Sequence, residues 1–282
     1  MSSPYILAHA KINLFLHVTG KRDDGYHLLE SLVTFAEFGD RLELKPAETL
    51  SLEITGPFAA SLSQDNIVMK AAQLLKNHTG YKAGAQMTLE KHIPVGAGLG
   101  GGSSDAAAAL LGLAKLWGVA IDDADMQKMA LQLGADVPVC LARRMAWMQG
   151  VGERVTPIKR KCDVWAVLVN PGAPLLTKDV FRRFSGAFTP PADMPKEIDS
   201  FDALMRCIQP KHNMLETPAM ALAPVIRDVL VAIGATPGCY LSRMSGSGAT
   251  CFGLYDNEAT AKAAAADIQR RFPQWWSRAT RL

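Results

Sequence analysis

The stretch from Pro94 to Ser104 is the part of the chain whose residue types most directly suggest chemistry. It reads Pro-Val-Gly-Ala-Gly-Leu-Gly-Gly-Gly-Ser-Ser, and five of the seven positions from Gly96 to Gly102 are glycine. Glycine accepts positive φ angles and lets the backbone approach a ligand closely, so successive N–H groups can point at one anion. The Ala- and Leu-rich run Asp105 to Trp117 ends before Gly118, which predicts a helix whose positive end faces the same loop. These features together predict a cradle for phosphate groups.

Two other glycine-rich motifs that bind nucleotides must be compared with this loop. The Walker pattern requires a lysine directly after the glycines, and the next lysine is Lys115, which excludes it. A Gly-x-Gly-x-x-Gly match begins at Gly96, with Asp122 near the place of a ribose-binding acid. However, the preceding segment Met87 to Pro94 carries charges and a proline instead of the continuous apolar run of a buried parallel strand. A dinucleotide-binding βαβ unit is therefore not expected.

Lys11 and Asp136 are the best candidates for phosphoryl-transfer chemistry, which depends on positioning, charge stabilisation and a base near the attacking oxygen. The Asp136 carboxylate can accept the proton of an alcohol. The Lys11 ammonium can keep that carboxylate ionised and stabilise the developing negative charge. From the residues alone, two simpler interpretations stay open. Asp136 follows the helix-ending Gly134 and can be a turn former, and a lone strand lysine can be a solvated edge charge.

The pattern Pro-x-x-x-Gly-Leu-Gly-Gly-Gly-Ser-Ser-Asp-Ala-Ala that starts at Pro94 resembles the glycine motif of the GHMP kinases. The likeness covers the whole chain. It includes Ala10-Lys11-Ile12-Asn13-Leu14, Gly25-Tyr26-His27, and the second glycine turn in the segment Met244 to Thr250. It implies an α+β fold of two lobes with the active site in the cleft between them. It also implies ATP as the phosphoryl donor with Mg²⁺ as its counterion.

The resemblance assigns roles to individual residues. It implies that Lys11 and Asp136 are catalytic and that the ATP phosphates are held by Pro94, Val95, Gly96, Ala97, Gly98, Leu99, Gly100, Gly101, Gly102, Ser103 and Ser104. The implied substrate-binding residues are Asn13, Tyr26, His27, Phe181, Gly246 and Ser247. An aromatic ring would stack on a cytosine, amide and imidazole groups would read its polar edge, and the second glycine turn would close over a diphosphate. No carboxylate stands out as a metal ligand, so the Mg²⁺ ligands remain unknown.

Several of these residues also have a purely structural interpretation. Tyr26 and Phe181 can fill core positions. Ser103 and Ser104 stand where helix N-cap hydroxyls belong. The second glycine turn can be an ordinary tight β-turn.

Within the family, the triple glycine and the Lys11-x-Asn13 and Tyr26-His27 pairs are similar to one branch. Its enzymes phosphorylate the 2-hydroxyl of a cytidine diphosphate-linked methylerythritol in non-mevalonate isoprenoid precursor biosynthesis. Two alternatives are another small-alcohol kinase of the family, such as a homoserine or mevalonate kinase, and a non-catalytic ligand-binding protein on the same fold. The acceptor residues disfavour the first, and the presence of both Lys11 and Asp136 disfavours the second.

The composition is that of an ordinary globular protein, with 49% hydrophobic and 20% charged residues among 282. A net charge of +3 without a long basic run gives no reason to expect nucleic acid or a membrane as partner, so a small molecule is the expected partner. Met1 to Pro4 lack a charged leader, and no run approaches the roughly 18 apolar residues of a spanning helix, which predicts a cytoplasmic protein. Five scattered cysteines without a Cys-x-x-Cys pair predict neither disulfides nor a zinc site.

Periodicity and turn residues predict the elements that position these groups. Expected strands are residues 5–18, 26–37, 41–44, 85–93, 164–169, 240–244 and 250–255. Expected helices are residues 66–76, 105–117, 124–133, 178–184 with Thr177 as N-cap, 219–233 and 258–271. Pro138 is expected to force Val137 out of helical angles and so to place Asp136 in a constrained turn. The expected domains are an N-terminal ATP-binding domain at 1–155 and a C-terminal α+β domain at 156–282.

Overall fold

The computed structural model describes residues 5–62 and 65–282, so the expectation for Met1 to Pro4 lies outside the described residues. The chain forms two compact units. The first comprises residues 1–10, 38–95 and 100–143, and the second comprises residues 11–37, 96–99 and 144–282. Strands β1 (Ile6–Asn13) and β3 (His27–Ala47) each contribute residues to both units. The expected division of the chain near residue 155 stays a prediction.

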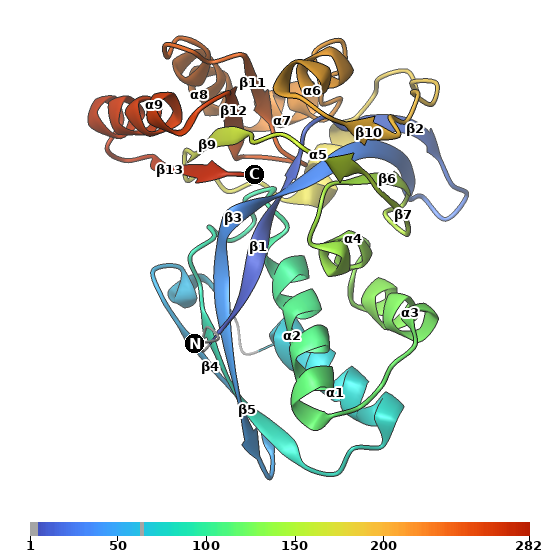
Figure 1. The fold of residues 1–282 in the computed structure, drawn as a ribbon. Coiled ribbons are helices and arrows are strands. Elements are labelled where there is room, and N and C mark those ends of the chain that lie inside the picture. The colour runs from blue at the N-terminus through green and yellow to red at the C-terminus, as the bar shows by residue number, and fades with distance from the viewer. Residues whose placement is uncertain (1–4, 63–64) are drawn as a thin grey trace. The chain divides into compact units, whose positions relative to one another are not determined.

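The first unit combines a few strands with helices α1 to α4 (Figure 1). Strand β5 (Gly84–Glu90) pairs antiparallel with the second half of β3 and parallel with β4 (Leu50–Thr55). The helices are α1 (Ile67–Thr79), α2 (Gly101–Trp117), α3 (Asp123–Leu133) and α4 (Val137–Ala142), and a short 3₁₀ turn covers Ala59–Ser61. Helix α2 packs against both α1 and α4. It is buried along most of its length because its alanines allow close contact with its neighbours.

Local capping explains where the helices of the first unit begin and end. Asn66 caps α1, its Oδ1 accepting from the amide of Val68 at 2.8 Å. Asp122 caps α3 in the same way, accepting from the amide of Asp125 at 2.7 Å. Gly80 and Gly118 end α1 and α2 in the left-handed conformation that glycine adopts without strain. The helix predicted over residues 66–76 is thus confirmed, and it extends to Thr79.

The second unit contains a sheet of four described strands in the order β11-β12-β9-β13, all antiparallel. They are β9 (Trp165–Asn170), β11 (Leu241–Met244), β12 (Cys251–Tyr255) and β13 (Trp276–Arg281). Helices α8 (Val225–Gly234) and α9 (Glu258–Arg271) pack on this sheet, with Val167, Ile233 and Ile268 in the shared core. The remaining elements are β2 (His17–Lys21), β6 (Ala146–Gly150), β7 (Arg154–Pro157), β8 (Lys159–Arg160), α5 (Thr177–Arg183), β10 (Glu197–Ile198), α6 (Phe201–Ile208) and α7 (Glu216–Leu222).

Several local predictions are wrong in instructive ways. The helix expected over residues 219–233 is two helices, α7 and α8, because Pro224 cannot donate the hydrogen bond that would join them. The two strands expected over residues 26–37 and 41–44 are one continuous strand, β3. Val137 is the first residue of α4 with Pro138 beside it, since proline is accepted in the first helical turn, where its missing N–H would have no partner.

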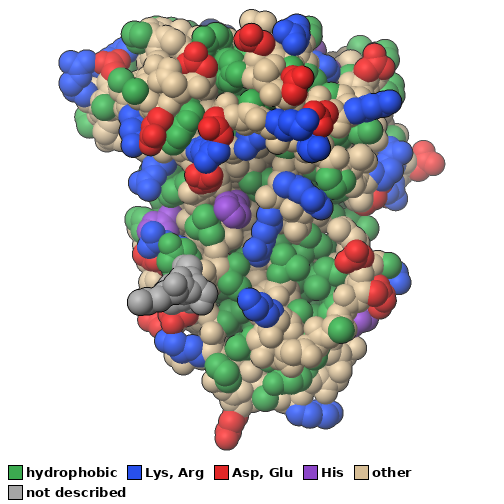
Figure 2. All heavy atoms as spheres, in the orientation of Figure 1, with side chains coloured by type: hydrophobic (Ala, Val, Ile, Leu, Met, Phe, Trp, Pro, Cys, Tyr) green, Lys and Arg blue, Asp and Glu red, His purple; other side chains and the backbone are tan. Residues whose placement is uncertain are grey.

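The α+β fold class is confirmed, because helices pack on sheets whose pairings are mostly antiparallel. Figure 2 shows both basic and acidic side chains on the face drawn. None of the helices found in residues 5–62 and 65–282 combines the length and hydrophobicity of a transmembrane span.

Candidate active site

The middle of the glycine loop, residues 96–99, is fixed by its carbonyl groups within the second unit. Three successive carbonyls accept hydrogen bonds: Ala97 from the amide of Thr250 at 3.1 Å, Gly98 from the hydroxyl of Ser245 at 3.0 Å, and Leu99 from the amide of Lys11 at 2.8 Å. The loop therefore lies between strand β1 and the second glycine turn. This contact brings together three segments that the sequence singled out separately.

Ser245 is the residue that joins these segments. Its side chain is fully buried, and its hydroxyl accepts from the backbone N–H of Asn13 at 3.2 Å while donating to the carbonyl of Gly98. The sequence analysis assigned Gly246 and Ser247 but not Ser245. The Ser-Gly-Ser-Gly spacing marked the turn, whereas only the tertiary contact distinguishes the first serine from the second.

Among Gly96, Gly98, Gly101 and Gly102, Gly98 tolerates a side chain least. Its φ is +74°, and a Cβ built there would lie 2.4 Å from the carbonyl oxygen of Ser245 and 2.8 Å from that of Gly248. Both obstacles are backbone atoms, so they cannot swing aside. A Cβ at Gly102 would instead lie 3.8 Å from Ile67, an ordinary contact.

We therefore expect Gly98→Ala to lower the melting temperature and weaken ATP binding by at least about tenfold, which is a loss of about 1.4 kcal/mol. Gly102→Ala is the matched control and should change the melting temperature little. Thermal melts and calorimetric titration with ATP measure both properties. A Gly98→Ala protein that melts and binds ATP like the parent would contradict the close approach.

The loop leads into helix α2, which begins without a side-chain cap. Gly100, with φ +61°, is the N-cap residue, and the first helical hydrogen bond runs from the amide of Ser104 to its carbonyl at 2.8 Å. The expectation that Ser103 and Ser104 cap this helix is wrong, because both lie inside its first turn. Ser104 is buried and donates to the Cys140 thiol at 3.3 Å. The backbone N–H groups that come before Ser104 have no acceptor within the helix, as at other helix N-termini that bind anions.

The structure excludes the simpler interpretation of Lys11 but not that of Asp136, which does lie in a turn, at residues 135–136. Lys11 is only 3% exposed, so it is not a solvated edge charge. Asp136 is half-buried at the N-cap position of α4, and its side chain makes no capping hydrogen bond, unlike that of Asp122 at α3. Capping therefore does not account for the carboxylate. Lys11 belongs to the second unit and Asp136 to the first, and their pairing stays a prediction.

The side chain of Asn13, at the end of β1, is held by Ser31 of the neighbouring strand β3. Its Nδ2 donates to the Ser31 hydroxyl at 2.8 Å, and that hydroxyl donates to the carbonyl of Phe15. Its Oδ1 is buried and has no hydrogen-bond partner within the described part of the chain. Buried acceptors are nearly always satisfied. This oxygen is thus an acceptor that a bound ligand can satisfy.

His27 and Phe181 form an aromatic pair in the second unit. Their rings stack with centroids 5.1 Å apart and planes 21° apart, and Phe184 meets His27 edge-on at 5.9 Å. Burial, with a smaller contribution from Lys21, lowers the pKa of His27, which favours the neutral ring, and a neutral imidazole can both donate and accept a hydrogen bond. Tyr26 is 62% exposed, which excludes the core-filling interpretation for this residue. Phe181 both stacks on His27 and packs against the core.

The second glycine turn has two supports that the sequence analysis missed. The Asn213 side chain is buried and donates to the carbonyls of Met244 and Gly246, each at 2.8 Å. The Thr177 hydroxyl lies 2.8 Å from that of Ser247. The expectation that Thr177 is the N-cap of α5 is wrong, because Thr177 is the first helical residue and Leu176 occupies the N-cap position. No local sequence signal marks either contact, since the partners are more than thirty residues apart.

Two family models match the chain. Residues 66–144 match the family described as GHMP kinases N terminal domain, and residues 196–274 match GHMP kinases C terminal. The 4-diphosphocytidyl-2-C-methyl-D-erythritol kinase of Paramagnetospirillum magneticum is 52% identical over 277 residues, covering 98% of this chain and 97% of the relative.

Solved structures extend the comparison. The chain resembles a crystal structure of 4-(cytidine 5'-diphospho)-2C-methyl-D-erythritol kinase with a TM-score of 0.81 and 37% identity, covering 98% of each chain. A homoserine kinase from Cytophaga hutchinsonii shares the fold, with a TM-score of 0.69 and 16% identity over 99% of this chain and 95% of that one. Full-length similarity at this identity, together with both family matches, shows that the chain belongs to the GHMP kinases.

Proposed function

We propose that this protein transfers the γ-phosphoryl group of ATP to the 2-hydroxyl of 4-diphosphocytidyl-2-C-methyl-D-erythritol, a step of non-mevalonate isoprenoid precursor biosynthesis. The observation that carries the proposal is the 52% identity, over nearly the whole chain, to a kinase named for this acceptor. The ATP-dependent kinase activity follows from the family. The acceptor and the residue roles below are our proposal.

In the proposed mechanism, Asp136 accepts a hydrogen bond from the acceptor hydroxyl and takes its proton as the phosphoryl group arrives. Lys11 stabilises the negative charge that builds up on the transferred group. A buried ammonium suits this role because few water molecules compete with it for the developing charge, and Lys11 is almost fully buried. The alcohol proton ends on the carboxylate, and ADP leaves with the charge of the broken bond.

The ATP phosphates are held by the backbone of Pro94 to Ser104. Two features support this assignment. The carbonyls of residues 97–99 already accept hydrogen bonds from the protein. The first backbone N–H groups of α2 have no acceptor within the helix and can donate to phosphate. The positive end of the α2 dipole adds a favourable interaction with an anion.

Mg²⁺ fits this site as an ion that comes with the nucleotide. Among residues 5–62 and 65–282, no group of three or more His, Cys, Asp or Glu side chains could form a metal cage. Mg²⁺ is commonly held by substrate phosphates, water and one or two protein ligands, so it needs no such cage. The ion would neutralise phosphate charge during transfer, and the Ser103 and Ser104 hydroxyls are the protein oxygens proposed near it.

Recognition of the acceptor rests on Asn13, Tyr26, His27 and Phe181. The exposed Tyr26 ring offers a stacking face for cytosine, and the neutral His27 can hydrogen-bond to its polar edge. The unsatisfied Asn13 Oδ1 can accept from a substrate hydroxyl. Gly246 and Ser247, supported by Asn213 and Thr177, would face the diphosphate.

The proposal is tested by ADP release from ATP with a panel of acceptors: the cytidylylated methylerythritol, methylerythritol phosphate, mevalonate, homoserine and galactose. We expect turnover with the first and very poor turnover with the others, because a hydrogen-bonding site penalises an acceptor that leaves it unpaired. Comparable turnover with mevalonate or homoserine would replace the acceptor assignment by the other family activity. Absence of turnover with every acceptor would favour the non-catalytic alternative.

Tyr26→Ala tests the stacking role. Loss of one base-stacking face costs about 1–3 kcal/mol, so the acceptor KM should rise roughly 5- to 150-fold while the ATP KM stays unchanged. Because Tyr26 is 62% exposed, the melting temperature should change little. Tyr26→Phe keeps the ring and is the matched control. An unchanged acceptor KM in Tyr26→Ala would remove Tyr26 from the site.

The small-molecule acceptor is the partner that the family implies. The absence of a nucleic-acid or membrane partner and the cytoplasmic location stay predictions.

A further inference from the structure

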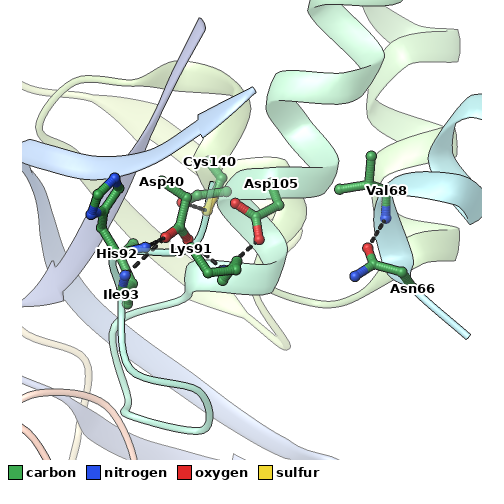
Figure 3. A network of polar contacts seen from close by, with 9 residues as sticks. Asp40, Asn66, Val68, Lys91, His92, Ile93, Asp105 and Cys140 are labelled. Carbon is green, nitrogen blue, oxygen red and sulfur yellow. Dashed lines mark hydrogen bonds and ion pairs between the residues drawn. The ribbon is translucent and has the colours of Figure 1, made fainter. Parts of the chain in front are cut away.

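A buried network of charged side chains lies in the first unit beside the glycine loop (Figure 3). At its centre is Lys91, which directly follows β5 and is only 3% exposed. Its ammonium contacts Oδ2 of Asp40, in β3, and Oδ2 of Asp105, in α2, the latter at 2.6 Å. Asp40 and Asp105 are themselves fully or almost fully buried. None of the three residues has a role in the proposed mechanism.

The first arm of the network holds the chain where it enters the glycine loop. The second oxygen of Asp40 accepts from the amide of His92 at 2.6 Å and from that of Ile93 at 2.8 Å. With Lys91, the carboxylate thus fixes three consecutive residues, and Pro94 follows at once. Figure 3 shows the Asp40 carboxylate pointing at this segment. The backbone direction with which the loop starts is set here.

The second arm holds the chain where it leaves the loop. Asp105 is the fifth residue of α2, the helix whose first residues are proposed to hold phosphate. The Lys91 ammonium also lies against the beginning of this helix, 3.5 Å from the position of a Cβ on Gly101. One ammonium therefore ties residues 91–93 to residues 101–105, the two ends of the loop.

The charges of the network indicate that it fixes geometry more than it stabilises the fold. Removing charges from water is costly, and a buried ion pair adds little net stability relative to apolar side chains of the same size. Asp105 adds to the desolvation penalty, because its Oδ1 is buried without a hydrogen-bond partner among the described residues. Burial raises the pKa of Asp105 far above its ordinary range, with a further increase from Asp40, against the opposing effect of Lys91.

We propose that Lys91 is a positioning residue for ATP, which through Asp40 and Asp105 holds the two ends of the glycine loop at the separation that phosphate binding requires. This inference rests on the proposed function, because it presupposes that the loop binds ATP. Phosphate contacts made by backbone amides depend on the loop geometry alone, and a displacement of about 1 Å can cost about 10²-fold in rate. The two ends are tied by side chains, so substitutions can release one end without altering the loop sequence.

Substitutions at Asp105 separate the tie from the fold. Asp105→Asn keeps the shape and an oxygen that accepts from Lys91, whereas Asp105→Leu keeps the approximate size but removes the acceptor and leaves Lys91 balanced by Asp40. We expect Asp105→Leu to weaken binding of ADP and of a non-hydrolysable ATP analogue by roughly tenfold, and Asp105→Asn to stay within about threefold of the parent. The acceptor KM should change in neither variant. Calorimetric titration without acceptor gives the nucleotide affinities, and steady-state assays give the two KM values.

Lys91→Met releases both ends and should weaken nucleotide binding by up to about 10²-fold at temperatures where the variant is folded. A purely structural role would lower the melting temperature and leave the nucleotide affinity of the folded protein unchanged. The inference is overturned if Asp105→Leu and Asp105→Asn bind nucleotide equally well, and this comparison stands even if Lys91→Met does not fold. If the parent itself binds no ATP, the proposed function fails. If the parent and all variants bind it alike, only the role of Lys91 fails.

Discussion

Asp136→Asn is expected to lower kcat by about 10²- to 10⁴-fold while ATP binding persists. The amide keeps the size and hydrogen-bonding shape of the carboxylate but cannot accept the proton of the attacking hydroxyl, and general-base catalysis contributes a factor of this size. Since the Asp136 side chain makes no capping hydrogen bond to α4, the substitution should not disturb the start of that helix. Steady-state kcat and calorimetric ATP affinity are the measurements.

Asp122→Asn is the control for this experiment. Asp122 also precedes a helix of the first unit, and its side chain does cap that helix, a role that asparagine fills equally well. The kcat of Asp122→Asn should equal that of the parent. If Asp136→Asn retains turnover within a few-fold of the parent, Asp136 is not the base, and the proton must leave through water or through the substrate.

Lys11→Met is the second substitution with a large expected effect, a fall in kcat of about 10²- to 10³-fold. Loss of one preorganised charge donor near the transferred group removes about 2.7–4 kcal/mol of transition-state stabilisation. Methionine preserves much of the length and apolar stem of lysine, which matters because Lys11 is buried. The backbone amide of Lys11 keeps its hydrogen bond to Leu99, so the glycine loop should stay in place and ATP affinity should fall much less than kcat.

Lys45→Met provides the comparison for Lys11. Lys45 also lies in a strand, but its side chain is 60% exposed and pairs with Glu43 on the surface, at 2.9 Å. Such exposed pairs contribute about 0–1 kcal/mol, so both activity and stability should be nearly those of the parent. Equal kcat values for Lys11→Met and Lys45→Met would show that Lys11 serves packing alone.

The sequence by itself determined the features that depend on near neighbours in the chain. Helix 258–271 has the predicted bounds, because its cap residue Asn257 and its helix-favouring alanines act within a turn or two. The positive φ angles of the glycine loop likewise follow from local residue types. The alternation of residues 5–18 predicted a single half-buried strand, but β1 ends at Asn13 and its last four residues are all buried. The family resemblance rests on the same local patterns, which is why the fold class and the kinase family could be predicted without coordinates.

The tertiary structure decided what depends on residues far apart in the chain. Asp40 and Lys91 are 51 positions apart, and Asn13 and Ser245 are 232 apart, so no local pattern predicts that either pair meets. The same holds for burial: Lys11 is enclosed although a lone strand lysine can be a solvated edge charge, and Tyr26 is exposed although a tyrosine can fill a core position. Capping and periodicity act through neighbouring backbone groups, whereas buried ion pairs and close backbone contacts form only when the fold brings distant side chains together. The loop that holds phosphate was therefore predictable from its glycines, but the side chains that fix its two ends were not.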